Sequence, residues 1–230
     1  MRARPILFSS PMIRALLAGT KTQTRRAIKG VPSWDHYGRD IMDWGLSGIH
    51  QETYDPSDPI EGTDRWHLDV QTDVDDHSRR VIRCPYGQPG DLLYVRETWA
   101  SDGQGGVRYY ATDDVHDLRR KRVSIHMPRW ASRLTLEITD VRVERLQDIS
   151  EADAEAEGVR EPSLGDGLTV FAQNGGGFIP RADAPPLLLW EALWRRINGD
   201  ESWSANPWCW ALSFKVHRAN VDQVLAERAA

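Results

Sequence analysis

The chain has 230 residues, 40% of them hydrophobic, and its 29 basic and 34 acidic side chains give a formal net charge of −5. This length fits one large domain or one domain with long insertions. The longest apolar run, Pro185 to Trp190, is far too short to cross a bilayer, so we expect no membrane partner. The negative charge argues against a protein that grips duplex nucleic acid through its phosphates and suits a small ligand better.

Cys84 and Cys209 are the only cysteines, and their spacing matches neither a disulfide framework nor a zinc site. The N-terminus is basic but lacks the apolar stretch and cleavage site of a signal peptide. We therefore expect a cytoplasmic protein, and a monomer. The ten tryptophans are the most unusual feature of the composition. Most are expected in the core, but one or two could wall a cleft and stack on a planar heterocycle.

The first predicted elements are a short strand at 6–8 and a helix at 11–18. Ser10 suits the N-cap of this helix, Pro11 its first position and Gly19 its C-terminal stop. The helix is followed by a run that packs one lysine, three threonines and two arginines into eight residues, Gly19-Thr20-Lys21-Thr22-Gln23-Thr24-Arg25-Arg26.

Lys21 and Thr24 in this run are three residues apart. A tight turn or helical segment would place both side chains on one side. A threonine hydroxyl becomes a nucleophile when a base or a cation assists it, and a lysine of lowered pKa can be that base. The pair is therefore a candidate for chemistry, with a solvated basic turn as the alternative.

From about Val31 to Arg80 the sequence is irregular, and only Trp66 to Gln71 alternates like a strand. The segment has too few periodic apolar residues for a core of its own. We therefore predict a single domain spanning 1–230, with an irregular insertion at about 31–80 that folds against it.

Clearer strand signals follow at 81–84, 92–99, 107–112 and 134–146. The second of these projects Arg96 and Glu97, and the third is expected to form a hairpin with it. The last alternates over many residues and predicts a long antiparallel strand with a bulge at Thr139-Asp140.

A helix is predicted at 151–157, because Ser150 and Asp153 have the spacing of a capping box and Gly158 is a stop. Glu157 lies in its last turn, where the helix dipole disfavours a carboxylate, so this residue is a candidate for function. The other acidic residues of the helix, Asp153 among them, fit solvated or first-turn roles better.

The remaining elements are a Gly-rich loop at about 160–183, an amphipathic helix at 187–197 and a last strand at 206–216. The predicted strands and helices show no alternating βαβ order. The fold class is therefore α+β, with a small curved sheet or barrel.

Four stretches, in order from Arg4 to Phe214, resemble the ASCH domain family. They are the helix with Gly19 to Arg26, then Gly90 to Trp99, the long strand leading into Leu146 to Glu151, and Asn206 to Trp210. The resemblance extends over nearly the whole chain and is closer to the longer members that phages and prophages often encode. It implies a PUA-like fold, a small β-barrel flanked by helices.

Some ASCH proteins are amidohydrolases that remove acyl groups from N4-acylcytosine nucleosides such as N4-acetylcytidine. They use a lysine, a threonine three residues later, and a glutamate near the end of the helix after the long strand. The resemblance assigns these roles to Lys21, Thr24 and Glu157, with no metal or organic cofactor. The best-known members are about half as long and lack the segments at 31–80 and 160–183, which could tune the acyl group accepted or block the cleft.

Two versions of the mechanism stay open at this point. Lys21 could take the proton of Thr24 as its hydroxyl attacks the acyl carbonyl. Alternatively, Glu157 could be the base through a water molecule, because a carboxylate beside Lys21 raises the pKa of that lysine. Arg26, or backbone N–H groups at 23–25, could hold the oxyanion.

Three further residues are candidates for substrate binding. Trp99 could stack on the pyrimidine, and Arg96 or Glu97 could hydrogen-bond to its edge, with an ion pair between the two as the alternative. The competing function is a non-catalytic module that binds RNA or a modified base. A ribonuclease ranks last, because no histidine pair is evident.

Overall fold

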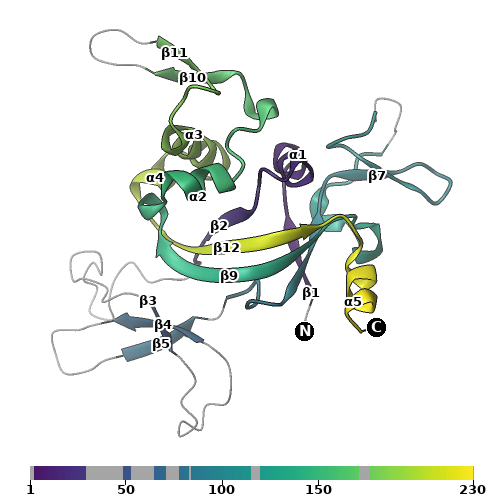
Figure 1. The fold of residues 1–230 in the computed structure, drawn as a ribbon, viewed down its shortest axis with the longest axis horizontal. Helices are drawn as coiled ribbons and strands as arrows, with labels where there is room; N and C mark the ends of the chain where they lie inside the picture. Colours follow the sequence, from purple (N-terminus) through teal and green to yellow (C-terminus); the bar gives the residue numbers. More distant parts are fainter. Residues whose placement is uncertain are drawn as a thin grey trace, which may run out of the picture. The chain divides into compact units, whose positions relative to one another are not determined.

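Two long, curved strands form the centre of the main sheet, β9 (Thr135–Arg145) and β12 (Trp208–His217) (Figure 1). The computed structural model describes residues 3–29, 49–52, 65–70, 78–82, 84–114, 120–170 and 177–229. The two strands are antiparallel, and their register shifts where Asp140 pairs with Ser213 but Ile138 pairs with Phe214. This leaves Thr139 without a partner residue, which confirms the predicted bulge.

Three shorter strands complete this sheet, whose order is β1-β6-β9-β12-β2. β6 (Leu92–Arg96) is antiparallel to β9, and β2 (Gln23–Ala27) is antiparallel to β12, whereas β1 (Ala3–Leu7) runs parallel to β6. The fold is mixed α+β with a mostly antiparallel sheet, as predicted. The described strands form an open sheet with β1 and β2 at its edges, so the closed PUA-like barrel stays a prediction.

The described residues contain five α-helices: α1 (Ser10–Ala18), α2 (Glu151–Ala156), α3 (Pro186–Asn198), α4 (Glu201–Ser204) and α5 (Val221–Ala229). The sequence did not predict α5, which covers β6 by packing Val221 and Val224 against Leu92 and Tyr94. Short 3₁₀ turns lie at Ser124–His126, Arg129–Ala131, Leu146–Asp148 and Pro162–Leu164. Within the described ranges, no helix combines the length and the apolar character needed to cross a bilayer.

Two hairpins lie outside the main sheet. β7 (Trp99–Ser101) pairs with β8 (Val107–Tyr109), which confirms a hairpin in this region. β10 (Gly167–Val170) pairs with β11 (Gly177–Pro180), inside the segment predicted as a Gly-rich loop. The loop prediction was wrong here because the glycines flank short apolar stretches that pair with each other.

The chain divides into two compact units, and Ile28–Pro85 form the second one. Its described strands are β3 (Ile49–Glu52), β4 (Arg65–Val70) and β5 (Ser78–Ile82), which form an antiparallel sheet in that order. The insertion predicted at 31–80 falls within this unit. It therefore contains three strands, where the sequence indicated one.

α1 ends at Gly19, whose left-handed φ of 77° confirms the predicted stop. The N-cap of α1 is Ser9, one residue earlier than the predicted Ser10. Pro11 is therefore the second residue of the helix rather than the first, and the first turn tolerates proline at this position as well. Gly158, with a φ of 78°, follows α2. A Cβ atom on Gly158 would lie 2.9 Å from the Cβ of Ala15 and 3.1 Å from that of Lys21. Gly158 thus permits the ends of α1 and α2 to approach each other.

We expect Gly158→Ala to lower the free energy of unfolding more than Gly19→Ala does. Both positions have a positive φ, which costs a residue with a Cβ about 1–2 kcal/mol. A Cβ on Gly19 meets no atom within 4 Å, so only Gly158→Ala adds steric overlap. Urea unfolding of the two variants measures the difference, and equal losses would contradict the close approach.

Candidate functional site

Lys21 is held by its backbone between the ends of two helices. Its N–H donates to the carbonyl of Ala15 at 3.2 Å, and the N–H of Thr22 donates to the carbonyl of Ala156 at 2.8 Å. Lys21 and Glu157 thereby form an isolated antiparallel bridge. The end of α1 and the end of α2 are thus joined at the two residues that the sequence singled out.

The side chains of Lys21 and Glu157 form a buried ion pair. Lys21 Nζ donates to Glu157 Oε2 at 2.7 Å and to the Glu157 carbonyl at 2.8 Å, and the two residues are only 1% and 2% exposed. Burial lowers the pKa of Lys21, and this effect outweighs the charge and hydrogen bond of Glu157, which raise it. Lys21 therefore loses its proton more readily than an exposed lysine.

Thr24 and Arg26 lie on β2, where alternation directs them to one face and Gln23 and Arg25 to the other. The prediction of a tight turn or helical segment was wrong, because residues 23–27 pair with β12 as an edge strand. Lys21 and Thr24 nevertheless line the same pocket. β2 places Thr24 in this pocket, and the bridge to Glu157 places Lys21 there.

This pocket has a volume of about 170 Å³ and two kinds of wall. Its polar residues include Lys21, Thr24, Arg26 and Glu157, and the start of the chain adds Leu7, Phe8, Ser9 and Met12. α3 contributes Trp190, Leu193, Trp194, Ile197 and Asn198. The Phe8 ring centroid lies 5.6 Å from Lys21 Nζ and 5.2 Å from Arg26 Cζ, so its face interacts with both cations.

Several buried polar atoms of the pocket residues have no hydrogen-bond partner in the described part of the chain. They are Arg26 Nε, Glu157 Oε1, and the indole Nε1 atoms of Trp190 and Trp194. Buried polar atoms are normally paired, and unpaired ones are costly. Three donors and one acceptor of the pocket residues therefore lack a hydrogen bond within the described structure, and a polar ligand could supply it.

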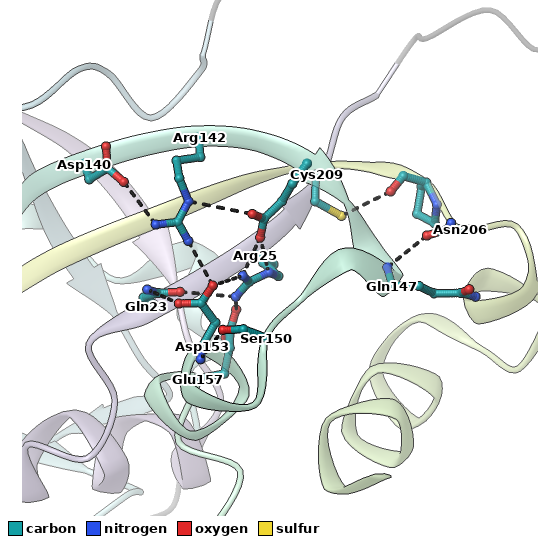
Figure 2. A network of polar contacts seen from close by, with 12 residues as sticks. Gln23, Arg25, Asp140, Arg142, Gln147, Ser150, Asp153, Glu157, Asn206 and Cys209 are labelled. Atoms are coloured by element: carbon teal, nitrogen blue, oxygen red, sulfur yellow. Dashed lines mark hydrogen bonds and ion pairs between the residues drawn. The ribbon is translucent and has the colours of Figure 1, made fainter. Parts of the chain in front are cut away.

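Arg25 also lines the pocket, and it is the centre of a polar network (Figure 2). Its side chain is fully buried, and it donates to Glu144 Oε1 at 2.8 Å and to Asp153 Oδ2 at 3.0 Å. Its Nη1 lies 3.5 Å from Glu157 Oε1, close enough for an ion pair without a hydrogen bond. The sequence analysis gave a solvated basic turn as the alternative for residues 19–26. Arg25 contradicts this alternative, because its side chain is buried.

Asp153 joins this network from α2. It accepts hydrogen bonds from Gln23 Nε2 at 2.7 Å, from Arg25, and from Arg142 Nη2 at 3.0 Å. Burial raises the pKa of Asp153, but these hydrogen bonds and the charges of Arg25 and Arg142 outweigh it and hold the pKa below its ordinary value. The capping prediction is confirmed too, because the Asp153 N–H donates to Ser150 Oγ at 3.1 Å.

Cys209 lies on β12 beside the network and is fully buried (Figure 2). Burial raises the pKa of its thiol to about 12. A thiol of this kind is not a nucleophile at neutral pH, because the thiolate is the reactive form. Thr24 is therefore the better candidate for a nucleophile among the residues around the pocket.

Three predicted substrate-binding residues do not line this pocket. Glu97 is buried and paired with Arg133 through two hydrogen bonds of 2.8 and 2.9 Å, so the alternative ion pair with Arg96 is not formed. Trp99 is buried against Met127 and Ala131. Arg96 donates to the carbonyl of Ile125 at 3.1 Å.

The sequence analysis missed the aromatic residues that do line the pocket, Phe8, Trp190 and Trp194. The two tryptophans are one helical turn apart on α3, with ring centroids 5.6 Å apart. This i, i+4 spacing was visible in the sequence and could have identified them as one wall.

Comparison of the chain with protein-family models, with curated proteins and with solved structures gave no match. Among the described residues, no group of three or more His, Cys, Asp or Glu side chains is arranged to hold a metal ion. The pocket and the polar network around Arg25 are therefore the features that bear on function.

We expect Asp153→Asn to lower the free energy of unfolding at neutral pH by roughly 1–3 kcal/mol, because it removes charged hydrogen bonds. The native pKa of Asp153 is lowered, so its stabilisation is present above the unfolded pKa of about 3.9 and is lost as the pH falls through the native value. Urea unfolding at several pH values should show the two proteins converging in acid.

The control is Glu151→Gln, an exposed carboxylate in the same helix. If Asp153→Asn and the unmodified protein differed in free energy of unfolding by the same amount at every pH, the stabilising role of the Asp153 charge would be contradicted.

Proposed function

We propose that the protein is an amidohydrolase that removes the acyl group from N4-acylated cytosine nucleosides of the N4-acetylcytidine type. The observation that carries this proposal is the buried Lys21–Glu157 pair in the wall of a pocket that Thr24 also lines. The resemblance to the ASCH family assigns catalysis to the same three residues. A nucleoside substrate also suits the proposed cytoplasmic location and the negative net charge.

A PUA-like arrangement of the sheet is part of the proposal. The side chain of Arg26, on one edge strand, donates to the carbonyl of Leu7, on the other, at 2.7 Å. This hydrogen bond joins the two edge strands of the sheet, β1 and β2. In a barrel-like sheet the two edges curve toward each other, so the contact supports this arrangement.

The first step uses Lys21 as a neutral amine. A neutral lysine has two N–H bonds and one lone pair, and Lys21 directs its donors to the carbonyl and carboxylate of Glu157. The lone pair is then available for the hydroxyl proton of Thr24. As that proton moves to Nζ, Thr24 Oγ1 attacks the acyl carbonyl carbon and a tetrahedral oxyanion forms.

Arg26 is suited to hold this oxyanion. Its Nε is a buried donor without a hydrogen-bond partner in the described structure, and its residue lines the pocket. When the tetrahedral intermediate collapses, the C–N4 bond breaks and N4 takes the proton from Lys21. Cytidine leaves, and Thr24 keeps the acyl group as an ester.

Glu157 is suited to complete the cycle. Its Oε2 is bonded to Lys21, while Oε1 is a buried acceptor with no hydrogen bond among the described residues. Oε1 can accept a proton from a water molecule that attacks the Thr24 ester. The C–O bond to Thr24 then breaks, Thr24 Oγ1 takes the proton that Glu157 holds, and the released carboxylic acid loses its own proton to water.

We expect Lys21→Met, Thr24→Val and Glu157→Gln each to lower kcat/KM for N4-acetylcytidine by about 10²-fold or more, because each removes a proton-transfer or nucleophilic group. Product chromatography measures cytidine release, and circular dichroism checks that each variant folds. Thr22→Ala is the matched control, because Thr22 is exposed two residues from Thr24.

Thr24→Ser keeps a hydroxyl and should retain most of the activity. Full activity of Thr24→Val would eliminate Thr24 as the nucleophile. No turnover by the unmodified protein, with acetyl or with bulkier acyl groups, would overturn the proposed function in favour of a binding module.

The pH dependence of kcat/KM tests the role of Lys21. The active form is the neutral amine, and burial lowers the pKa of Lys21, so the rate should rise with pH through a value below the ordinary 10.4 or so. Glu157→Gln removes the carboxylate that raises the pKa of Lys21. Its residual activity should therefore titrate at a lower pH, and a shift to higher pH would contradict Lys21 as the base.

A further inference from the structure

The pocket has a buried end and an exposed end. Lys21, Thr24 and Glu157 line it and are at most 3% exposed, so the groups proposed to act on the amide lie at the buried end. α3 also lines the pocket with Ile197, which is 58% exposed, and with the exposed Asn198. The C-terminal end of α3 therefore marks the mouth of the pocket.

If the proposed function holds, on which this inference rests, these two ends determine how the substrate lies. The C4 amine of the pyrimidine carries the acyl group and N1 carries the sugar, and the two positions are opposite each other across the ring. When the amide lies at Thr24, the sugar therefore lies at the mouth. A cavity of about 150 Å³ binds benzene, so this pocket of about 170 Å³ has room for the pyrimidine ring between the two ends.

Two tryptophans of α3 line the pocket before the helix reaches its mouth. Trp190 and Trp194 are one helical turn apart, both are buried, and their ring centroids lie 5.6 Å apart. Within the described part of the chain, the Nε1 atom of each is a buried donor without a hydrogen-bond partner. A buried indole N–H normally has a partner. A ligand with two acceptors in this pocket would provide one for each indole.

One edge of cytosine carries such a pair of acceptors. Between C4 and N1 this edge presents N3 and O2 and no donor, whereas the opposite edge carries only C–H groups, which suit the apolar Phe8 and Met12 of the pocket. Other bases with an acylated amine do not match two donors. Adenine has one acceptor beside its amine, followed by a C–H group, and guanine has an N–H donor beside its amine.

We propose that the indole N–H groups of Trp190 and Trp194 bind the N3 and O2 edge of the base and make the protein specific for acylated cytosine. Trp190 is farther from the mouth along α3, so its N–H donates to N3, beside the reacting amine. Trp194 is one turn nearer the mouth and donates to O2. A site of buried donors rejects a base that leaves one of them unpaired.

The first experiment measures kcat/KM for N4-acetylcytidine and for N6-acetyladenosine with unmodified protein, Trp190→Phe and Trp194→Phe. Phenylalanine keeps an aromatic ring and removes the N–H. We expect the unmodified protein to prefer the cytidine derivative by about 10²-fold or more. Each variant should lower kcat/KM for N4-acetylcytidine about tenfold, the worth of one hydrogen bond, and should leave the rate with N6-acetyladenosine unchanged.

Trp208→Phe is the matched control. Trp208 Nε1 is also buried without a hydrogen-bond partner in the described structure, but this residue does not line the pocket. Trp208→Phe should therefore hydrolyse N4-acetylcytidine at the normal rate, and circular dichroism checks that all three variants fold.

The 3-deaza analogue of N4-acetylcytidine, which has a C–H group in place of N3, tests the contact of Trp190. Trp190→Phe should lower kcat/KM for N4-acetylcytidine but not for the analogue, because the analogue has already lost the acceptor. Trp194→Phe should lower kcat/KM for both substrates. Equal losses from Trp190→Phe on the two substrates would overturn the assignment of Trp190 to N3.

Two-dimensional ¹⁵N–¹H spectra give a readout that does not depend on turnover. The indole signals of Trp190 and Trp194, identified by their absence in the two variants, should move downfield with the product cytidine and stay in place with adenosine. If the protein hydrolyses N4-acetylcytidine but these signals do not move and the variants behave like Trp208→Phe, the inference is overturned and the proposed function stands. If the signals move but no acylated cytidine is hydrolysed, the proposed function is overturned and the two indoles serve a module that binds cytosine.

Discussion

Burial of charge is the constraint on which the candidate site depends. Lys21, Arg25 and Glu157 are almost completely inaccessible, and an isolated buried charge costs several kcal/mol. Each must therefore be paired, and pairing them requires α1, β2 and α2 to meet in one place. Glu157 serves both cations, with Oε2 bonded to Lys21 and Oε1 at 3.5 Å from Arg25. Glu157 Oε1 is nevertheless left without a hydrogen bond among the described residues.

Elements with a strong local signal were predictable from the sequence. β9 and α3 follow their hydrophobic periods closely, and the Ser150 cap and the stops at Gly19 and Gly158 agree with the structure. These features depend on neighbours within a few residues, where propensity and capping act. The candidate residue Glu157 was noticed for a similar reason, since a carboxylate at the end of a helix opposes the dipole.

Contacts between distant segments were not predictable in this way. Arg25 and Asp153 looked like surface residues, yet they bond to each other across 128 residues of sequence. β2 consists of Gln-Thr-Arg-Arg-Ala, which carries no alternating apolar pattern, so only its pairing with β12 identifies it as a strand. Trp99 was selected by residue type alone, and nothing in its local sequence indicated that Met127 and Ala131 would cover it.

The edge position of β2 has a consequence for how the protein is made. Within the main sheet β2 pairs only with β12, and β12 spans Trp208–His217 near the end of the sequence. Thr24 pairs with Leu212, so its strand has no partner in this sheet until β1, β6 and β9 have all been synthesised. Because contacts this far apart in sequence slow folding, the pocket that Thr24 lines should be among the last parts to form. A chain that lacks β12 would leave Thr24 on an unpaired strand, whatever other strands of the sheet had already formed.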